Sequence, residues 1–251
     1  MTGLDTAGHA NPRHAKLTAV GDCALLVEFE NRISSEINDR VLNLVRQVDQ
    51  SAITGIKAAV PAYRTLLIHY DSLTIDYQSL CAAVRPLLSG GAIPARTIKH
   101  WLIPVLYGGE AAPDLPQLAN RHGLSEEQVI DIHSSATYRV YMAGFAPGWT
   151  FLGGLDPRLY TPRLDAPRAE VPTGCISIGG EQTLIGGQAM PSGWNLIGRT
   201  PERSFAPERD EPFFMAAGDK VSFRRINQDE FNDLSQQAAG GARVSRELAP
   251  Q

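Results

Sequence analysis

The feature that most limits how this chain can fold is a run of short β-prone segments separated by glycine and proline. The β-prone segments are 138–142, 176–178, 183–185 and 220–226. They are preceded by residues 98–106, in which apolar side chains alternate. Several short strands with turn residues between them are typical of an antiparallel barrel or sandwich. We therefore expect an antiparallel β domain in the second half of the chain.

The first part of the chain has a different pattern. Residues 17–29 are β-prone but interrupted by Gly21-Asp22, which indicates a strand or a hairpin. The segments that follow are a helical periodicity at 33–48, β-prone residues at 56–60 and 65–70, and a second helical periodicity at 77–88. This order predicts a small ferredoxin-like α+β domain over residues 17–91.

Glycine and proline in Ser89–Pro94 indicate a linker, so a second domain is expected over residues 95–237. Two short helices are expected in it, one after Asp114 and one after Ser125, and a last helix at 227–237. The tail, residues 238–251, has few apolar residues and is expected to be disordered.

The composition argues against several classes of protein. Among 251 residues, 23 Lys and Arg stand against 27 Asp and Glu, without a dense basic run, so we expect no nucleic-acid partner. No segment approaches the roughly 20 apolar residues of a membrane span. The polar segment Met1–Lys16 lacks the apolar centre of a signal peptide. The cysteines Cys23, Cys81 and Cys175 show no metal-type spacing with each other or with the histidines, so we expect free thiols, no metal site and a cytoplasmic protein.

Two Pro-Arg steps, Pro162-Arg163 and Pro167-Arg168, follow a stretch rich in glycine, proline and aromatic residues at Gly144–Leu155. Two guanidiniums on proline-restricted loops can form a preorganised site for a carboxylate or a phosphate. The alternative is that both are surface arginines paired with Asp165 and Glu170, and the spacing favours neither interpretation. The aromatic stretch by itself is also explained by a barrel rim with tight turns.

Two further motifs are weaker. Gly179-Gly180 before Glu181 resembles a phosphate-cradling turn, but no G-x-x-x-x-G-K-[ST] motif occurs, so an independent nucleotide site of that kind is not expected. Asp219 is expected to cap a turn before the last strand rather than to bind a metal.

In their order along the chain, these segments resemble the KipI family, also called allophanate hydrolase subunit 1 or PxpB, the B subunit of bacterial 5-oxoprolinase. The resemblance is carried by Gly144–Leu155, Pro162–Gly174, Ile178–Gln182, Gly193–Pro201 and Gly218–Ile226, and upstream by Val60–Leu66, Tyr107–Glu110, Asp114-Leu115 and Val129–His133. Three places depart from the family pattern: Cys175 follows Gly174 where Ser is usual, Ser192 stands where Gly precedes Gly-Trp, and Gly186-Gly187 replace a Tyr-Pro pair. These departures concern the expected pocket and hence substrate specificity.

The resemblance implies a ferredoxin-like N-terminal domain followed by a cyclophilin-like antiparallel β-barrel. It also implies a subunit, inactive alone, of an ATP-hydrolysing amidohydrolase that opens 5-oxoproline to glutamate. The implied partners are a KipA/PxpC-type subunit and a PxpA-type third subunit; ATP is expected to be shared with the partner, and Mg²⁺ can accompany it. Two alternatives are a KipI-like inhibitor of a histidine kinase and a carboxyltransferase-like subunit of a urea-carboxylase or allophanate-hydrolase system.

Candidate site residues lie in the same segments. Those expected to bind substrate are three arginines and two aromatic pocket walls: Arg163, Arg168, Arg199, Phe145 and Trp194. Those expected to supply acid–base or hydrogen-bonding groups are Glu110, His133 and Gln182. Each of these three has a structural alternative: a turn residue, a helix C-terminal cation and a strand-end partner, respectively. Cys175 is expected to be a small buried thiol rather than a nucleophile.

Overall fold

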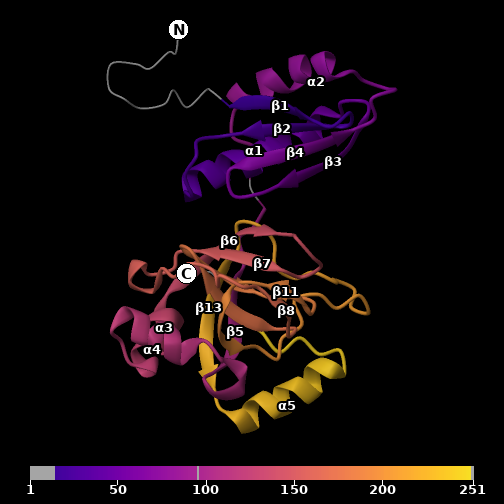
Figure 1. Ribbon diagram of the computed structural model, residues 1–251. Helices are drawn as coiled ribbons and strands as arrows, with labels where there is room; N and C mark the ends of the chain where they lie inside the picture. Colours follow the sequence, from indigo (N-terminus) through magenta and orange to yellow (C-terminus); the bar gives the residue numbers. More distant parts are fainter. Residues whose placement is uncertain (1–14, 95, 250–251) are drawn as a thin grey trace. The chain divides into compact units, whose positions relative to one another are not determined.

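The structure is a computed structural model that describes residues 15–94 and 96–249. The chain divides into two compact units, residues 1–96 and 97–251 (Figure 1). The boundary between them lies two residues after the predicted linker Ser89–Pro94. Most of the segment Met1–Lys16, for which no signal peptide is expected, lies outside the described residues. Within the described ranges, no helix is both long and apolar enough to cross a membrane.

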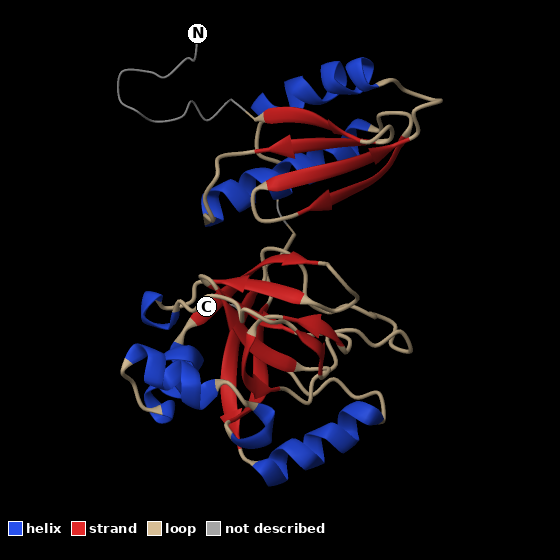
Figure 2. Ribbon diagram, viewed as in Figure 1, coloured by secondary structure: helices blue, strands red, loops and turns tan. Residues whose placement is uncertain are grey.

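The first unit is a four-stranded antiparallel sheet with two helices (Figure 2). In sheet order, its strands are β1 (Lys16–Val20), β2 (Ala24–Glu28), β4 (Thr65–Tyr70) and β3 (Ile56–Pro61). Its helices are α1 (Ser35–Ser51) and α2 (Tyr77–Val84), and α2 continues into the 3-10 turn η1 (Arg85–Ser89). The predicted α+β unit is confirmed, and the segment 17–29 is a hairpin rather than one strand.

Alternation of apolar residues along the strands determines which face of the sheet meets the helices. Leu66 and Ile68 of β4 are fully buried, because every second side chain of a strand points to the same face. They form one core cluster with apolar residues that recur at helical spacing: Ile37, Val41, Leu44 and Val48 in α1 and Leu80 and Val84 in α2.

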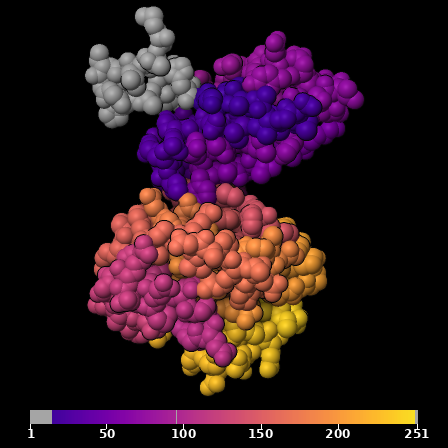
Figure 3. Space-filling model, in the orientation of Figure 1, coloured from indigo at the N-terminus to yellow at the C-terminus, as the bar shows by residue number. Residues whose placement is uncertain are grey.

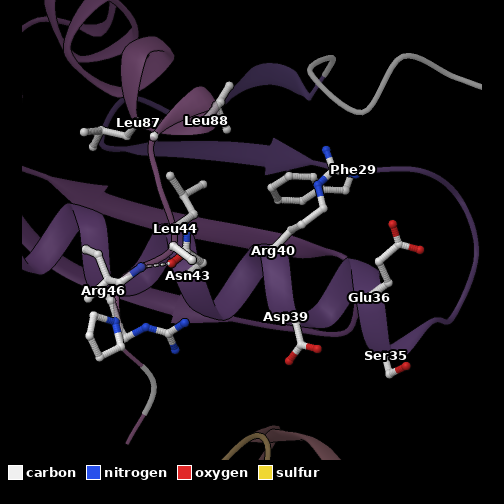
Figure 4. A pocket seen from close by; sticks show the side chains of 14 residues that line it. Phe29, Ser35, Glu36, Asp39, Arg40, Asn43, Leu44, Arg46, Leu87 and Leu88 are labelled. Atoms are coloured by element: carbon white, nitrogen blue, oxygen red, sulfur yellow. Dashed lines mark hydrogen bonds between the residues drawn. The ribbon is translucent and has the colours of Figure 1, made fainter.

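Part of the predicted linker is bound to α1. The Gln47 side chain donates from Nε2 to the Gly91 carbonyl at 3.0 Å, and the Ile93 N–H donates to Asn43 Oδ1 at 2.8 Å. These contacts border a cavity of about 850 Å³ between α1 and residues 87–94, in which Leu44, Leu87 and Leu88 supply apolar walls (Figure 4). The free part of the linker is therefore shorter than the sequence predicts.

The second unit is a closed seven-stranded barrel with an added ribbon. Around the barrel the strands are β12 (Asn195–Arg199), β9 (Cys175–Gly179), β10 (Gln182–Ile185), β7 (Thr150–Gly153), β6 (Thr137–Ala143), β13 (Lys220–Ile226) and β5 (His100–Tyr107). Pairing of β5 with β12 closes the ring. The ribbon pairs β8 (Arg168–Val171) with β11 (Met190–Ser192).

Helices pack on the outside of the barrel, and the residues of the helix expected at 227–237 lie at its surface (yellow in Figure 3). They are α3 (Leu115–His122), α4 (Glu126–Ser135) and α5 (Gln228–Ala239), with 3-10 turns η2 (Gly109–Ala111) and η3 (Pro157–Leu159). The predicted capping box at Ser125 is present, and Asp219 accepts a bond from Ala216 N at 3.0 Å as the predicted turn cap. Asp219 also accepts from Lys99 N at 2.9 Å, so it ties this turn to the start of β5.

The barrel is not wholly antiparallel, which corrects the sequence-based expectation. Strand β13 runs parallel to β5, from the pair Lys220–His100 to the pair Ile226–Leu106. The two strands are separated in the sequence by most of the barrel, so the chain can return to β5 in either direction. Hydrophobic alternation is the same in both cases and therefore does not reveal strand direction.

The predicted disorder of residues 238–251 is wrong for the described part of that tail. Strand β14 (Arg246–Leu248) pairs with β5. The carboxylate of Glu202, which is 2% exposed, accepts bonds from Ser245 N at 2.7 Å, Ser245 Oγ at 2.8 Å and Val244 N at 2.8 Å. It also pairs with Arg209 at 3.0 Å. Polar contacts hold this segment in place, so its low content of apolar residues does not indicate disorder.

We expect Glu202→Ala to lower the free energy of unfolding by about 3 kcal/mol or more, because it removes the counter-charge of Arg209 and leaves the N–H groups of Val244 and Ser245 without their acceptor. The control is Glu208→Ala, which removes an exposed acid that pairs with Arg203. Urea unfolding measures both variants, and limited proteolysis should cut the tail first in the Glu202 variant. Equal unfolding midpoints for the two variants would contradict this role for Glu202.

Candidate functional site

Two of the predicted site residues, Glu110 and Arg199, line one hollow of the barrel unit. Its volume is about 460 Å³, and its other walls include Tyr107 at the end of β5, Pro172, and Phe231 of α5. The residues meet because β5 pairs with β12 at this point, where Leu106 lies opposite Arg199. Closure of the barrel therefore brings together two side chains that lie far apart in the sequence.

The turn that carries Glu110 depends on two glycines. Gly108 has φ +80° and Gly109 has φ +58°, in the left-handed region that glycine adopts without steric cost. A Cβ at either position would meet nothing within 4 Å, so backbone conformation rather than space selects glycine here. Glu110 follows in the 3-10 turn η2 and is exposed, and the described residues give its carboxylate no ion-pair partner.

Arg199 is fixed along one edge. Its Nε donates to the Thr173 carbonyl at 3.0 Å, and its Cζ lies 5.9 Å from the centre of the Phe231 ring. No carboxylate within the described ranges pairs with its terminal nitrogens. The guanidinium also lines an adjoining hollow of about 610 Å³ beside α5. A fixed cation, an accessible carboxylate and an aromatic wall can bind an oxyanion and hold a proton near it.

His133 lies elsewhere, in the core of the barrel unit, and is fully buried. Its Nε2 is 3.0 Å from Thr183 Oγ1, whose own proton is donated to the Ser177 carbonyl at 3.0 Å. Nε2 therefore donates, and Nδ1 accepts from the Tyr107 hydroxyl at 2.8 Å. Burial lowers the pKa of His133 to about 3, so the ring is neutral. This position favours a structural role over the predicted acid–base role, and it also argues against the alternative of a helix C-terminal cation.

Arg168 is engaged by protein. Its Nη2 donates to Asp114 Oδ1 at 2.6 Å, and the other oxygen of Asp114 accepts from Leu196 N at 2.7 Å. Asp114 is 6% exposed. The arginine therefore links strand β8 to the start of α3 and to β12, so it positions these elements rather than presenting a free cation.

The remaining predicted residues do not line the hollow of Glu110 and Arg199. Phe145 is 68% exposed on its loop, with its ring centre 5.3 Å from that of Trp149. Trp194 is buried, and Arg163 lies over its ring at 5.4 Å. Gln182 begins β10, the strand-end position of the structural alternative. The predicted residues thus fall into several places rather than one site.

Two of the departures from the family pattern, at Cys175 and Gly186, are parts of one change in packing. A Cβ at Gly186 would lie 2.5 Å from the Cys175 sulfur, so the thiol occupies the space that a side chain at position 186 would need. Cys175 is 1% exposed, and burial raises the pKa of its thiol to about 11. The prediction that this thiol is buried is confirmed. At the third departure, the Ser192 hydroxyl accepts a bond from Trp194 N at 3.2 Å.

Sequence reasoning missed Tyr107 and Phe231 as walls of the hollow. Tyr107 belongs to a segment that resembles the family, but its hydroxyl is held by the buried His133, which lies 26 residues away in the sequence. Phe231 lies on α5, which carries an ordinary mixture of polar and apolar residues, and only barrel closure places it beside Arg199.

The burial of His133 predicts a pH dependence of stability. The unfolded state takes up a proton near the usual pKa of 6.5, whereas the folded state does not until about 3. The free energy of unfolding should therefore fall by about 1.4 kcal/mol per pH unit as the pH drops through this window. We expect urea unfolding of His133→Gln between about pH 6 and pH 4 to lack this part of the slope. The same slope in both proteins would show that His133 becomes protonated in the folded state.

Comparisons with known proteins agree with this architecture. The chain matches the family described as carboxyltransferase domain, subdomain C and D, over residues 15–215. The B subunit of 5-oxoprolinase from Bacillus subtilis (strain 168) is 33% identical over 89% of this chain and 98% of its own length. The protein of the same name from Escherichia coli O157:H7 is 36% identical over 84% of this chain and 96% of its own length.

Solved structures agree with the fold. TTHA0988 is 35% identical with a TM-score of 0.71 over 81% of this chain, which spans 40% of the TTHA0988 chain. The Kluyveromyces lactis urea amidolyase has a TM-score of 0.81 over 96% of this chain and 17% of its own, at 20% identity, which shows a shared fold. The expected combination of an α+β unit with a β-barrel is confirmed. The chain belongs to the carboxyltransferase subdomain C and D family, together with proteins named as the B subunit of 5-oxoprolinase.

Proposed function

We propose that this chain is the B subunit of an ATP-dependent 5-oxoprolinase, which opens 5-oxoproline to glutamate in the cytoplasm. The observation that carries the proposal is similarity over the full length of relatives with that name, 98% of one and 96% of another. The chain would be inactive alone and would act with a KipA/PxpC-type subunit and a PxpA-type third subunit.

The chemistry requires cations and a proton carrier. Lactam opening is uphill, and ATP would supply a phosphoryl group to the amide oxygen. Water would then add to the activated carbonyl carbon, the C–N bond of the ring would break, and the phosphoryl group would leave as phosphate. Positioning and charge neutralisation dominate such transfers. Arg199, held by Thr173 and Phe231, would bind the carboxylate or a phosphoryl oxygen of the reactants. Glu110 would hold or move a proton at the same hollow.

The donor groups of this hollow suit the phosphates of a nucleotide. It combines the Arg199 guanidinium with the open turn at Gly108 and Gly109, where close approach of a ligand meets no side chain. A Mg²⁺ ion that accompanies ATP binds phosphate oxygens, water and one or two carboxylates. Glu110 is the carboxylate that lines this hollow. We propose that ATP is shared with the partner subunit here.

We expect Arg199→Ala to reduce ATP-dependent release of glutamate from 5-oxoproline by about 100-fold or more in the assembled three-subunit complex, because a charge-stabilising donor is lost. The matched control is Arg158→Ala, an exposed arginine already paired with Asp156 at 2.8 Å. Thermal unfolding should confirm that both variants are folded. Full activity of a folded Arg199 variant would exclude the assigned role, and activity without this chain would exclude the proposed function.

A carboxyltransferase-like subunit of a urea-carboxylase system is the second candidate, favoured by the family description that matches residues 15–215. The reaction catalysed by the chain together with the partners that it binds distinguishes the two functions. Turnover of urea that depends on a biotinylated partner, without glutamate release from 5-oxoproline, would favour this second candidate.

A further inference from the structure

We propose that a second hollow of the barrel unit, between α3 and residues 161–165, binds a phosphate-type oxyanion through Arg121 and Arg163. Its volume is about 280 Å³, and both arginines line it. Its polar lining also includes Gln117, Thr161, Asp165 and Asn195. The hollow shares no lining residue with the one at Glu110 and Arg199, so it is a separate place in the fold.

The charges of the hollow favour an anion. Within the described ranges, neither Arg121 nor Arg163 pairs with a carboxylate, so the sequence-based alternative of an Arg163 pair with Asp165 or Glu170 is not observed. Two guanidiniums against the one carboxylate of Asp165 leave the lining net positive. Guanidiniums offer paired N–H donors in a planar fork that matches a phosphate or a carboxylate.

The segment that carries Arg163 is fixed by bonds on both sides of the arginine. Thr161 exchanges two backbone hydrogen bonds with Gly180, at 3.1 and 2.6 Å. The Pro162 carbonyl accepts from Asn195 Nδ2 at 2.9 Å, and Leu164 N donates to the Gly193 carbonyl at 2.7 Å. The guanidinium itself lies 5.4 Å from the centre of the buried Trp194 ring. Little ordering of the backbone is therefore required when a ligand binds.

The opposite wall, which carries Arg121, is joined to this segment. Nε2 of the neighbouring His122 lies 2.8 Å from Thr161 Oγ1, and the Thr161 hydroxyl donates its proton to the Leu159 carbonyl at 2.9 Å. His122 is therefore the donor in the first of these bonds. The end of α3 is closed by Gly123, whose N–H is donated to carbonyls of the last turn. Both walls are thus held at a defined separation.

This site is remote from the hollow at Arg199. Asn195 and Arg199 are the first and last residues of β12, which places them about 13 Å apart at roughly 3.3 Å per residue. The proposal goes beyond the proposed function and does not depend on it, because binding to the isolated full-length chain can be measured without any turnover.

The test is a titration of the full-length chain with inorganic phosphate, followed by tryptophan fluorescence at constant ionic strength with chloride as the reference. We expect a fluorescence change in the wild type and its loss in Trp194→Phe, because Arg163 lies on that ring. Arg121→Ala and Arg163→Ala should each weaken phosphate binding about tenfold, as loss of a charge-assisted bond predicts. Asp165→Asn should tighten binding by roughly twofold to fivefold, since it removes a repelling charge.

Arg158→Ala, which removes an exposed arginine that lines neither hollow, is the matched control and should leave phosphate affinity unchanged. Unchanged affinity in both the Arg121 and Arg163 variants would overturn the proposal, as would an equal loss in Arg158→Ala. A second titration with ATP identifies the source of the oxyanion. Tighter binding of ATP than of phosphate, weakened by the same two variants, would assign the site to a nucleotide, and weaker binding would assign it to free phosphate.

Discussion

Closure of the barrel between β5 and β12 is the contact on which the candidate site depends. It occurs where Gly198 lies opposite Tyr107. A Cβ at Gly198 would lie 2.9 Å from both the Leu106 carbonyl and a Val105 methyl carbon, so the two strands can approach only because residue 198 is glycine. The same contact places Arg199 beside the turn that carries Glu110. An open edge here would separate these residues and leave the backbone groups of β5 unpaired.

Four of the buried polar side chains in the barrel unit hold its parts together. The acids Asp114, Glu202 and Asp219 each accept backbone N–H bonds from residues distant in the sequence. His133 joins β5 to β10 through side-chain hydrogen bonds with Tyr107 and Thr183. A buried polar group without partners costs free energy, so these residues are fully bonded and leave no reactive atom free. The candidate functional residues are instead the accessible charges that remain without a protein counter-charge.

This distinction explains how much could be predicted from the sequence. The strands of the first unit, five strands of the barrel, the helices and the domain boundary follow from periodicity and from glycine and proline, which act locally. The short strands β7, β8, β11 and β12 were not predicted. The direction of β13 and the order in the tail depend on long-range pairing with β5, which local patterns do not record. Among the predicted arginines, Arg168 and Arg199 follow similar turn-rich motifs. Only the position of Asp114 shows that Arg168 is already paired. Arg121 was missed because an arginine in the last turn of a helix is ordinary.

Strand β12 links the two candidate anion sites. Its first four residues are buried, and it pairs with both β9 and β5, so its backbone is among the most constrained in the unit. Asn195 at its start binds the Pro162 carbonyl beside Arg163, and Arg199 at its end lines the hollow of Glu110. Arg199 ends this strand, and Asn195 at its start is bonded to the segment that carries Arg163, so the strand keeps the two sites at a fixed separation. Two oxyanions bound there would be held apart, which suits binding of separate groups better than direct transfer between the sites.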